Sequence, residues 1–272
     1  MRRLQSFIDS GSETIRVGMA SRFAVLGSPI KHSLSPAIHA AAFSVMGRQA
    51  DYESVELAVD LEGWVRGLGP EWQGLSLTMP LKEQALDVAD YLDPLAIAAL
   101  SANTLVRDGR SWLGYNTDIF GLQRATQDLE YATVGILGTG ATARSALLAF
   151  EEAEPWIWGR NSDKAVALAE AHGGRFSALE NVLSADLVIS TLPQGALAEI
   201  AGGKSYPGTL LDVVYSGSSS AARFSAAISG LQMLVWQALG QQRLFAGQGL
   251  DEPLQDEPTI VSAMRHAAGM EE

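Results

Sequence analysis

Residues 133–153 read TVGILGTGATARSALLAFEEA, an apolar run that leads through a glycine-rich turn into a segment rich in alanine and leucine. This order predicts a buried strand, a tight turn and a helix. Gly138, Gly140 and Ala143 have the spacing G-x-G-x-x-A, which in this setting is typical of dinucleotide binding. Gly138 permits the turn, Gly140 lets the backbone approach a pyrophosphate, and free amides at the helix start can hold the anion. A tight turn without a ligand is the alternative.

Apolar runs and helical stretches continue to alternate toward the carboxyl end. Strands are predicted at WIWG (156–159), DLVIST (186–191) and TLLDVV (209–214). Helical periodicity returns over residues 230–245 and 257–269. This alternation favours a Rossmann-like, doubly wound sheet in the second half of the chain.

The amino-terminal half predicts a mixed sheet instead. Strands are expected at 22–27, 51–57 and 74–78, and helices at 36–46, at 61–68 and from Pro80 onward. The runs SANTLV and SWLGYN flank an Asp108-Gly109 pair, which is a strong hairpin signal. Because a hairpin does not fit a purely parallel sheet, we expect an α/β protein with two different domains.

Composition narrows the class of protein. The chain of 272 residues is 47% hydrophobic and has no cysteine, which excludes disulfide-stapled and disordered proteins and favours a globular protein of the cytoplasm. Its formal net charge of −12 repels polyanions, so we expect neither nucleic acid nor a membrane as a partner. Residues 1–18 lack the apolar run of a signal peptide, and we expect them to form a dispensable extension.

The segment after the second predicted strand of the dinucleotide-binding half indicates which cofactor binds. NAD-binding domains place an acidic residue there, whereas this chain reads GRNSDK from Gly159 to Lys164. The Arg160 guanidinium can bind a phosphate dianion through charge-assisted hydrogen bonds. NADP is therefore favoured over NAD. The alternative is that Arg160 and Lys164 are solvated surface charges.

A lysine in the first half is a candidate for proton transfer. Lysine is scarce in this chain, and Lys82 follows a predicted strand in the tight turn TMPLK. A lysine near a cofactor cleft can transfer protons when a carboxylate lies beside it. Asp118, at the junction between the two halves, is the candidate partner. Spacing alone does not bring Lys82 and Asp118 together.

A series of motifs, in this order along the chain, resembles the shikimate dehydrogenase family. The motifs are Gly27-Ser28-Pro29-Ile30, His32-Ser33-Leu34-Ser35-Pro36, the T-x-P-x-K turn ending at Lys82, Ala102-Asn103-Thr104, Asn116-Thr117-Asp118, and Gly230-Leu231-Gln232-Met233-Leu234 with Gln237. The resemblance covers nearly the whole chain. It implies NADP-dependent, reversible reduction of 3-dehydroshikimate to shikimate in aromatic amino-acid biosynthesis.

The resemblance also implies how the chain divides. A substrate-binding and catalytic domain of residues 19–118 and 237–272 would face an NADP-binding domain of residues 119–236 across a cleft. The last helices would return to the first domain. A homodimer is compatible with this arrangement and stays open.

Residue roles follow by position in the motifs. Lys82 and Asp118 would handle the proton, with Lys82 as donor in the reducing direction. The implied substrate-binding residues are Ser33, Ser35, Thr78, Asn103, Asp118, Tyr215 and Gln237. The cofactor-binding candidates, taken from the glycine-rich turn and the resemblance together, are Gly138, Thr139, Gly140, Ala141, Thr142, Ala143, Arg160, Asn161, Lys164, Gly230 and Met233. The scattered histidines and the lack of cysteine predict no metal site.

Two positions depart from the family pattern. Ser76 stands where the family commonly has asparagine, so we expect one substrate contact to be lost or bridged by water. Gly159 and Asn161 flank Arg160 where the family often has Asn-Arg-Thr or Asn-Arg-Ser. The arginine is retained, so the phosphate argument holds.

Two other functions stay open at this point. One is a quinate or mixed quinate/shikimate dehydrogenase, in which threonine often replaces the serine at position 35 and NAD is often used. The other is a catalytically silent NADP-binding regulator. Ser35 and Arg160 speak against the first, and the retained Lys82 and Asp118 speak against the second.

Overall fold

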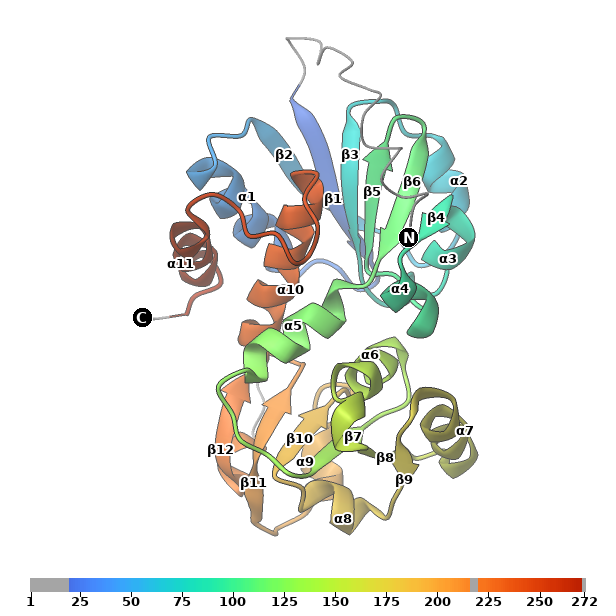
Figure 1. The fold of residues 1–272 in the computed structure, drawn as a ribbon, viewed down its shortest axis with the longest axis vertical. Helices are drawn as coiled ribbons and strands as arrows, with labels where there is room; N and C mark the ends of the chain where they lie inside the picture. The colour runs from blue at the N-terminus through green and yellow to red at the C-terminus, as the bar shows by residue number, and fades with distance from the viewer. Residues whose placement is uncertain (1–19, 216–219, 271–272) are drawn as a thin grey trace.

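Two six-stranded sheets lie one above the other in the computed structural model, with helices around and between them (Figure 1). The structure describes residues 20–215 and 220–270. The expected extension of residues 1–18 lies outside the described residues. The mixed α/β architecture in two parts agrees with the fold class predicted from the sequence.

The first sheet is mixed, as the hairpin signal predicted. Its strand order is β2-β1-β3-β5-β6-β4, and β5 runs antiparallel to both β3 and β6. The turn between β5 and β6 contains Gly109, whose φ of 60° suits glycine. The strands are β1 (Ser21–Gly27), β2 (Ala50–Glu56), β3 (Trp72–Leu77), β4 (Tyr91–Leu92), β5 (Thr104–Asp108) and β6 (Ser111–Tyr115).

The second sheet is parallel throughout, in the order β12-β11-β10-β7-β8-β9. The order reverses between β7 and β10, which creates a switch point where ligands bind in open parallel sheets. The glycine-rich turn follows β7 at this switch point. The strands are β7 (Val134–Leu137), β8 (Trp156–Trp158), β9 (Arg175–Phe176), β10 (Leu187–Ser190), β11 (Tyr206–Asp212) and β12 (Phe224–Ser229).

The helices cover both sheets and join them. Those of the first half are α1 (Ser35–Val45), α2 (Leu61–Arg66), α3 (Ala85–Val88), α4 (Pro94–Ala98) and α5 (Thr117–Thr126). Those of the second half are α6 (Ala141–Ala149), α7 (Ser162–His172), α8 (Leu179–Leu183), α9 (Ala196–Ala201), α10 (Gly230–Phe245) and α11 (Glu257–Ala267).

Helix α5 lies between the two sheets, and α10 packs closely along it (Figure 1). Gly121 of α5 makes this approach possible, because a Cβ there would lie 2.8 Å from the Cβ of Gln237. The close packing places Gln237 beside the start of α5. Both helices therefore carry residues of the candidate site.

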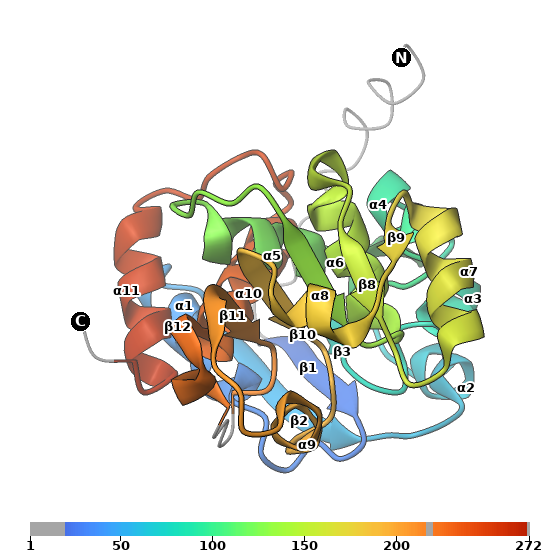
Figure 2. The ribbon, with the colours of Figure 1, turned by 90° about the horizontal axis from the view of Figure 1, so that it is seen from below.

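The last helix returns to the first sheet, as expected. Figures 1 and 2 both show α11 beside α1. Ile260 and Met264 of α11 pack in one apolar cluster with Ile38 of α1 and Leu239 of α10. Burial of this apolar surface holds the carboxyl-terminal helices on the first half of the molecule.

The segment after Pro80 corrects one expectation. The predicted long helix does not start there, and α3 begins only at Ala85. Leu81 N–H instead donates to Thr78 C=O, and Ala102 N–H donates to Lys82 C=O. These contacts close a turn and tie it to the strand region before β5, so the backbone at Lys82 does not enter a helix.

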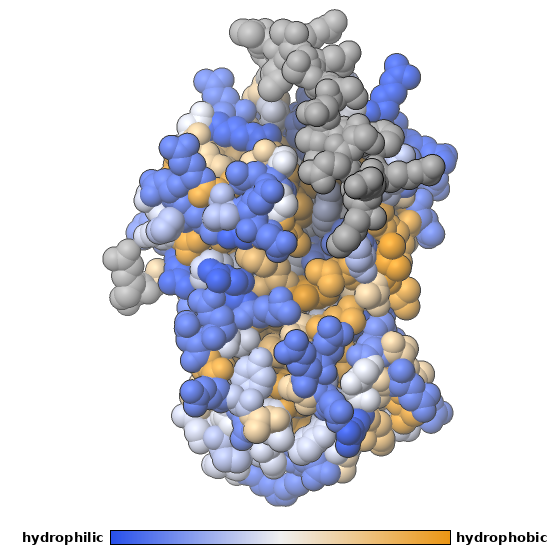
Figure 3. All heavy atoms as spheres, in the orientation of Figure 1, coloured by the Kyte–Doolittle hydropathy of each residue, from blue (hydrophilic) through white to orange (hydrophobic). Residues whose placement is uncertain are grey.

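The surface is mostly hydrophilic on the face shown in Figure 3, with apolar residues gathered beside α4. Leu95, Ile97 and Leu100 are exposed in this region. Among residues 20–215 and 220–270, none of the helices has the length and apolar character needed to cross a bilayer.

Candidate active site

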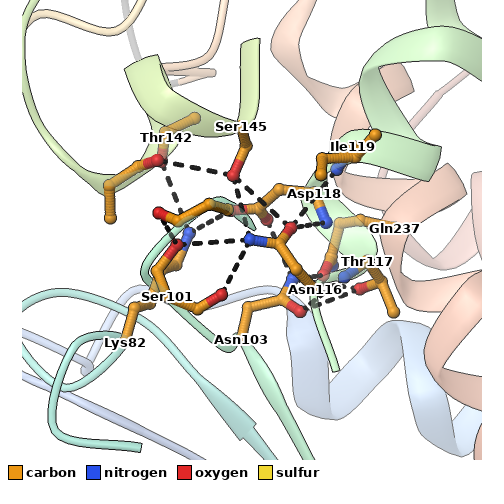
Figure 4. Close-up of polar contacts among 12 residues, drawn as sticks. Lys82, Ser101, Asn103, Asn116, Thr117, Asp118, Ile119, Thr142, Ser145 and Gln237 are labelled. Carbon is orange, nitrogen blue, oxygen red and sulfur yellow. Dashed lines mark hydrogen bonds and ion pairs between the residues drawn. The ribbon is translucent and has the colours of Figure 1, made fainter. Parts of the chain in front are cut away.

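The structure brings Lys82 and Asp118 together, although they lie on different elements. Lys82 Nζ donates to Asp118 Oδ2 over 2.6 Å, and the two side chains are only 14% and 5% exposed (Figure 4). Lys82 extends from the turn after β3, and Asp118 lies in the first turn of α5. The result is a largely buried ion pair at the level where the two sheets face each other.

The start of α5 holds Asp118 in place. Asn116 is the N-cap, and its Oδ1 accepts from the backbone N–H groups of Asp118 and Ile119. A carboxylate in the first turn of a helix is also favoured by the helix dipole. Asn103 Nδ2 donates to Asp118 Oδ1 at 2.9 Å. Both oxygens of Asp118 are therefore hydrogen-bonded, one to Lys82 and one to Asn103.

Thr142 connects the ion pair to the glycine-rich turn. Its Oγ1 lies 3.4 Å from Lys82 Nζ. Thr142 belongs to the first turn of α6, directly after Gly140. The proton-handling candidates of the first half therefore lie against the cofactor-binding candidates of the second half.

Asn103 and Gln237 lie next to this ion pair. Asn103 Nδ2 is 3.3 Å from Gln237 Oε1, and Gln237 Nε2 donates to Leu234 C=O. Thr78, the third residue expected to contact ring hydroxyls, is partly exposed and packs against Gly27 at the end of β1. A Cβ at position 27 would lie 2.2 Å from Thr78 Cγ2, so glycine is required for this approach.

Of the three residues expected to bind a carboxylate, two lie at the start of α1 and the third contacts the residue between them. Ser33 Oγ accepts from the backbone N–H of Ser35 at the start of α1. Tyr215 extends from the segment after β11 in the other half. Burial raises the pKa of Tyr215, and a hydrogen bond from the Leu34 backbone N–H lowers it in part. Tyr215 therefore lies at the loop that carries both serines.

The glycine-rich turn makes a tight connection from β7 to α6 at two of its glycines. Gly138 has φ 118°, and a Cβ there would lie 2.2 Å from Thr191 Oγ1. Gly140 is the N-cap of α6 and has no atom within 4 Å of where a Cβ would lie. Because glycine has no side chain to cap the helix, the first backbone amides of α6 are available to hold an anion. Ala143 is fully buried, which lets the helix pack on the sheet.

The residues after β8 agree with a ribose phosphate site. Arg160 and Lys164 are both exposed at the carboxyl edge of the second sheet. Asn161 is the N-cap of α7, and its side-chain Oδ1 accepts from the Lys164 backbone N–H. A Cβ at Gly159 would lie 2.5 Å from Thr139 Cγ2, so glycine lets this segment approach the glycine-rich turn. The donor set fits the 2′-phosphate of NADP.

Gly230 and Met233 open α10 beside the second sheet. A Cβ at Gly230 would lie 2.4 Å from the carbonyl oxygen of Asp212, so only glycine allows this contact. Met233 is 6% exposed and packs in the apolar cluster of β7 and α6. Its packing is that of a core residue.

Ser76, where a substrate contact was expected to be lost or bridged by water, forms hydrogen bonds with other side chains of the protein. Its Oγ accepts from Tyr52 OH at 2.6 Å and donates to Gln241 Oε1 at 2.8 Å, and the residue is 4% exposed. Gln241 was not identified from the sequence. A second glutamine, one helical turn after Gln237 and on the same helix, was the available signal.

Arg144 was also missed. This α6 residue is buried, and its Nε donates to Ala99 C=O at 2.7 Å while Nη2 donates to Glu83 and to Leu100 C=O. Leu100 has φ 48°, a left-handed conformation that is uncommon for residues other than glycine. Arg144 thus joins the cofactor half to the turn that follows Lys82. An arginine within an Ala- and Leu-rich helix was the signal in the sequence.

Ser145 of α6 makes a neighbouring contact of the same kind. Asn116 Nδ2 donates to Ser145 Oγ at 3.1 Å and to Ser101 C=O at 3.0 Å (Figure 4). Helix α6 therefore makes polar contacts with the first half of the chain through three residues, Thr142, Arg144 and Ser145. In the part of the chain that the structure describes, no three His, Cys, Asp or Glu side chains gather as a metal site.

Relatives are found along nearly the whole chain. The family model for the shikimate dehydrogenase substrate binding domain matches residues 25–105. A shikimate dehydrogenase (NADP(+)) of Thermus thermophilus is 33% identical over 266 residues, which cover 92% of this chain and 99% of that protein.

Solved structures agree in fold. The shikimate 5-dehydrogenase of Thermus thermophilus, in complex with NADP(H) and shikimate, is 32% identical with a TM-score of 0.79, covering 91% of this chain and 99% of that one. Mycobacterium tuberculosis shikimate dehydrogenase is 35% identical with a TM-score of 0.79, covering 90% and 99%.

Proposed function

This chain belongs to the shikimate dehydrogenase family, and from that premise we propose that it catalyses the NADP-dependent, reversible reduction of 3-dehydroshikimate to shikimate. The observation that supports this most strongly is the buried Lys82–Asp118 ion pair, 2.6 Å long, beside Thr142 of the glycine-rich turn. An ammonium group beside the glycine-rich turn is what proton transfer next to a bound nicotinamide would require.

Lys82 is the proton donor in the reducing direction. NADPH supplies the hydride to C3 of the substrate when it is bound. The Lys82 ammonium protonates the oxygen at C3, and the lysine takes a proton back in the oxidising direction. Asp118 holds the ammonium in position and stabilises its charge. Burial of both groups keeps competing water away from the ion pair.

Substrate orientation comes from two groups of polar side chains. Ser33, Ser35 and Tyr215 bind the substrate carboxylate through hydroxyl groups. The ring hydroxyls are bound by Thr78, Asn103, Asp118 and Gln237, which provide both donors and acceptors. Because these residues come from both halves of the molecule, binding fixes C3 next to Lys82.

The cofactor is bound by the turn from Gly138 to Ala143 and by the segment after β8. Free amides at the start of α6 hold the pyrophosphate. Arg160 binds the 2′-phosphate, with Lys164 adding positive charge and Asn161 shaping the turn. Gly230 and Met233 lie on the nicotinamide side of the cleft.

The division into domains stays a prediction: residues 19–118 with 237–272 bind substrate, and residues 119–236 bind NADP. A cytoplasmic location and a homodimer are predictions too. Equilibrium sedimentation of the purified protein would decide between one copy and two.

Steady-state kinetics with two acids and two cofactors test the function. We expect the highest kcat/KM with shikimate and NADP+. Higher kcat/KM with quinate and NAD+ would instead support the quinate dehydrogenase alternative. Tight NADPH binding without turnover of either acid would support a silent regulator and contradict the proposed reaction.

A further inference from the structure

Behind the proposed substrate site, His39, Gln241 and Gln242 form a buried polar cluster that the proposed mechanism does not use. His39 lies on α1, and the two glutamines lie on α10, all with almost no exposed surface. His39 Nε2 is 3.1 Å from Gln241 Oε1, and its Nδ1 is 2.8 Å from Gln242 Nε2. The imidazole therefore joins two glutamines of the helix that also carries Gln237.

The backbone carbonyl of Asn103 decides which way these groups point. Because a carbonyl oxygen only accepts, the Gln241 atom 3.2 Å from it is the Nε2 donor. Gln241 Oε1 then faces His39 and accepts from its Nε2–H. Burial lowers the pKa of His39 to about 3, so the ring is neutral and has a single N–H. Its Nδ1 must therefore accept from Gln242.

The same series of hydrogen bonds continues to the proposed catalytic carboxylate. Gln241 Nε2 donates to Thr104 Oγ1 at 3.0 Å, and Thr104 Oγ1 donates to Asn103 Oδ1 at 2.9 Å. Asn103 Nδ2 donates in turn to Asp118 Oδ1 at 2.9 Å. Each donor in this series points toward the carboxylate.

Tyr52 and Ser76 fix Gln241 from a second side. Tyr52 OH donates to Ser76 Oγ, and Ser76 Oγ donates to Gln241 Oε1. The Tyr52 ring also stacks on His39, with ring centroids 4.3 Å apart. Gln241 Oε1 therefore accepts from both Ser76 and His39. Rotating this amide by half a turn would set Oε1 against the Asn103 carbonyl oxygen in a buried place.

We propose that Gln241, acting through Thr104, is a positioning residue that, together with the Thr117 backbone N–H 2.8 Å from Asn103 Oδ1, keeps the Asn103 amide turned with its NH2 toward Asp118 and the substrate hydroxyls. The proposal rests on the proposed function, which places Asn103 in the substrate site. A reversed Asn103 would set Oδ1 against Asp118 Oδ1, so two acceptors would meet where water cannot separate them. The orientation also suits Gln237 Oε1, 3.3 Å from Asn103 Nδ2.

Breaking the series at one hydroxyl tests this role. Thr104→Val removes the hydroxyl with little change in shape. We expect kcat/KM for shikimate to fall about tenfold, the size of one hydrogen bond in a buried network, while KM for NADP+ stays unchanged. Thr104→Ser keeps the hydroxyl and restores kcat/KM. Gln241→Met interrupts the series one step earlier and produces the same selective loss.

Thr126→Val is the matched control. Thr126 is a buried α5 residue whose hydroxyl donates to Leu122 C=O at 3.0 Å, outside this series. We expect Thr126→Val to lower Tm about as much as Thr104→Val does, and to leave kcat/KM for shikimate and KM for NADP+ unchanged. Thr104→Val kinetics equal to those of Thr126→Val, or a loss that falls on KM for NADP+, would overturn the positioning role. A wild-type protein without shikimate turnover would contradict the proposed function instead.

Discussion

The substrate side and the cofactor side of the candidate site differ in how firmly the protein itself holds their residues. On the substrate side, Lys82, Asp118 and Asn103 are hydrogen-bonded to one another and largely buried. On the cofactor side, Gly140 faces open space and Arg160 is exposed. Chemistry thus depends on side chains that the protein has already oriented, because moving a proton requires a fixed donor. In the proposed function, cofactor binding depends on backbone amides and exposed cations.

The comparison predicts that substitutions on the substrate side lower kcat, whereas those on the cofactor side raise KM for the cofactor. The largest effect is expected at Lys82. Lys82→Ala removes the proton donor, and we expect kcat to fall about 100- to 10,000-fold, the usual contribution of general acid–base catalysis. NADPH binding, measured by fluorescence titration, stays close to wild type.

Lys204→Ala is the control for Lys82→Ala, because Lys204 is exposed and pairs with Glu180 on the surface. Its kcat stays unchanged. If Lys82→Ala turned over at the wild-type rate, Lys82 would not be the proton donor. The prediction that substitutions on the substrate side lower kcat would then be contradicted.

The next largest effect is expected on the cofactor side. Arg160→Ala removes a charge-assisted contact to the 2′-phosphate, and we expect KM for NADPH to rise about 10- to 100-fold. KM for NADH and kcat change little, because NADH has no 2′-phosphate. Arg175→Ala, another exposed arginine of the same half, serves as control. Equal losses with NADPH and NADH would refute the assignment.

Arg144 tests the contact between the two sides. Arg144→Met leaves the carbonyl oxygens of Ala99 and Leu100 without their donor, and we expect the free energy of unfolding to fall by about 1–3 kcal/mol. Glu83→Gln changes only the exposed partner of Arg144, and we expect it to lower the free energy of unfolding by less than about 1 kcal/mol. Urea titration measures both. Equal losses in the two variants would show that the buried carbonyls do not matter.

The smallest effect is expected for a change of one pH unit. Burial lowers the pKa of His39 from 6.5 to about 3, so the unfolded chain binds this proton more readily than the folded one. The free energy of unfolding therefore falls as pH drops below 6.5, by about 1 kcal/mol per pH unit near pH 5.5. His39→Gln removes this component. Identical pH slopes for wild type and variant, in urea titrations at several pH values, would contradict the buried neutral state.

Much of the fold follows from local patterns, whereas long-range polar contacts do not. The glycine-rich turn, the hairpin at Gly109 and the helix over residues 230–245 depend on neighbours in sequence, and the structure agrees with all three. The helix expected from Pro80 was wrong, because Ala102 N–H holds the Lys82 carbonyl from a distant segment. Tertiary contacts of this kind leave no periodic signal.

The candidate site shows the same limit. Lys82 and Asp118 were identified by residue type and motif, but only the folded chain shows that they are 2.6 Å apart. Arg144 and Gln241 were missed because a single polar residue on a helix does not reveal its partner. Their partners lie in segments far away in sequence, at Ala99 and at Asn103.

One assay tests the central claim most directly. Purified protein is mixed with shikimate and NADP+, and absorbance is followed at the nicotinamide band of NADPH. We predict a steady rise for the wild-type protein and almost none for Lys82→Ala, although both bind the cofactor. No rise with the wild-type protein, or an equal rise with both, would contradict the assignment of Lys82 as the proton donor of an NADP-dependent shikimate dehydrogenase.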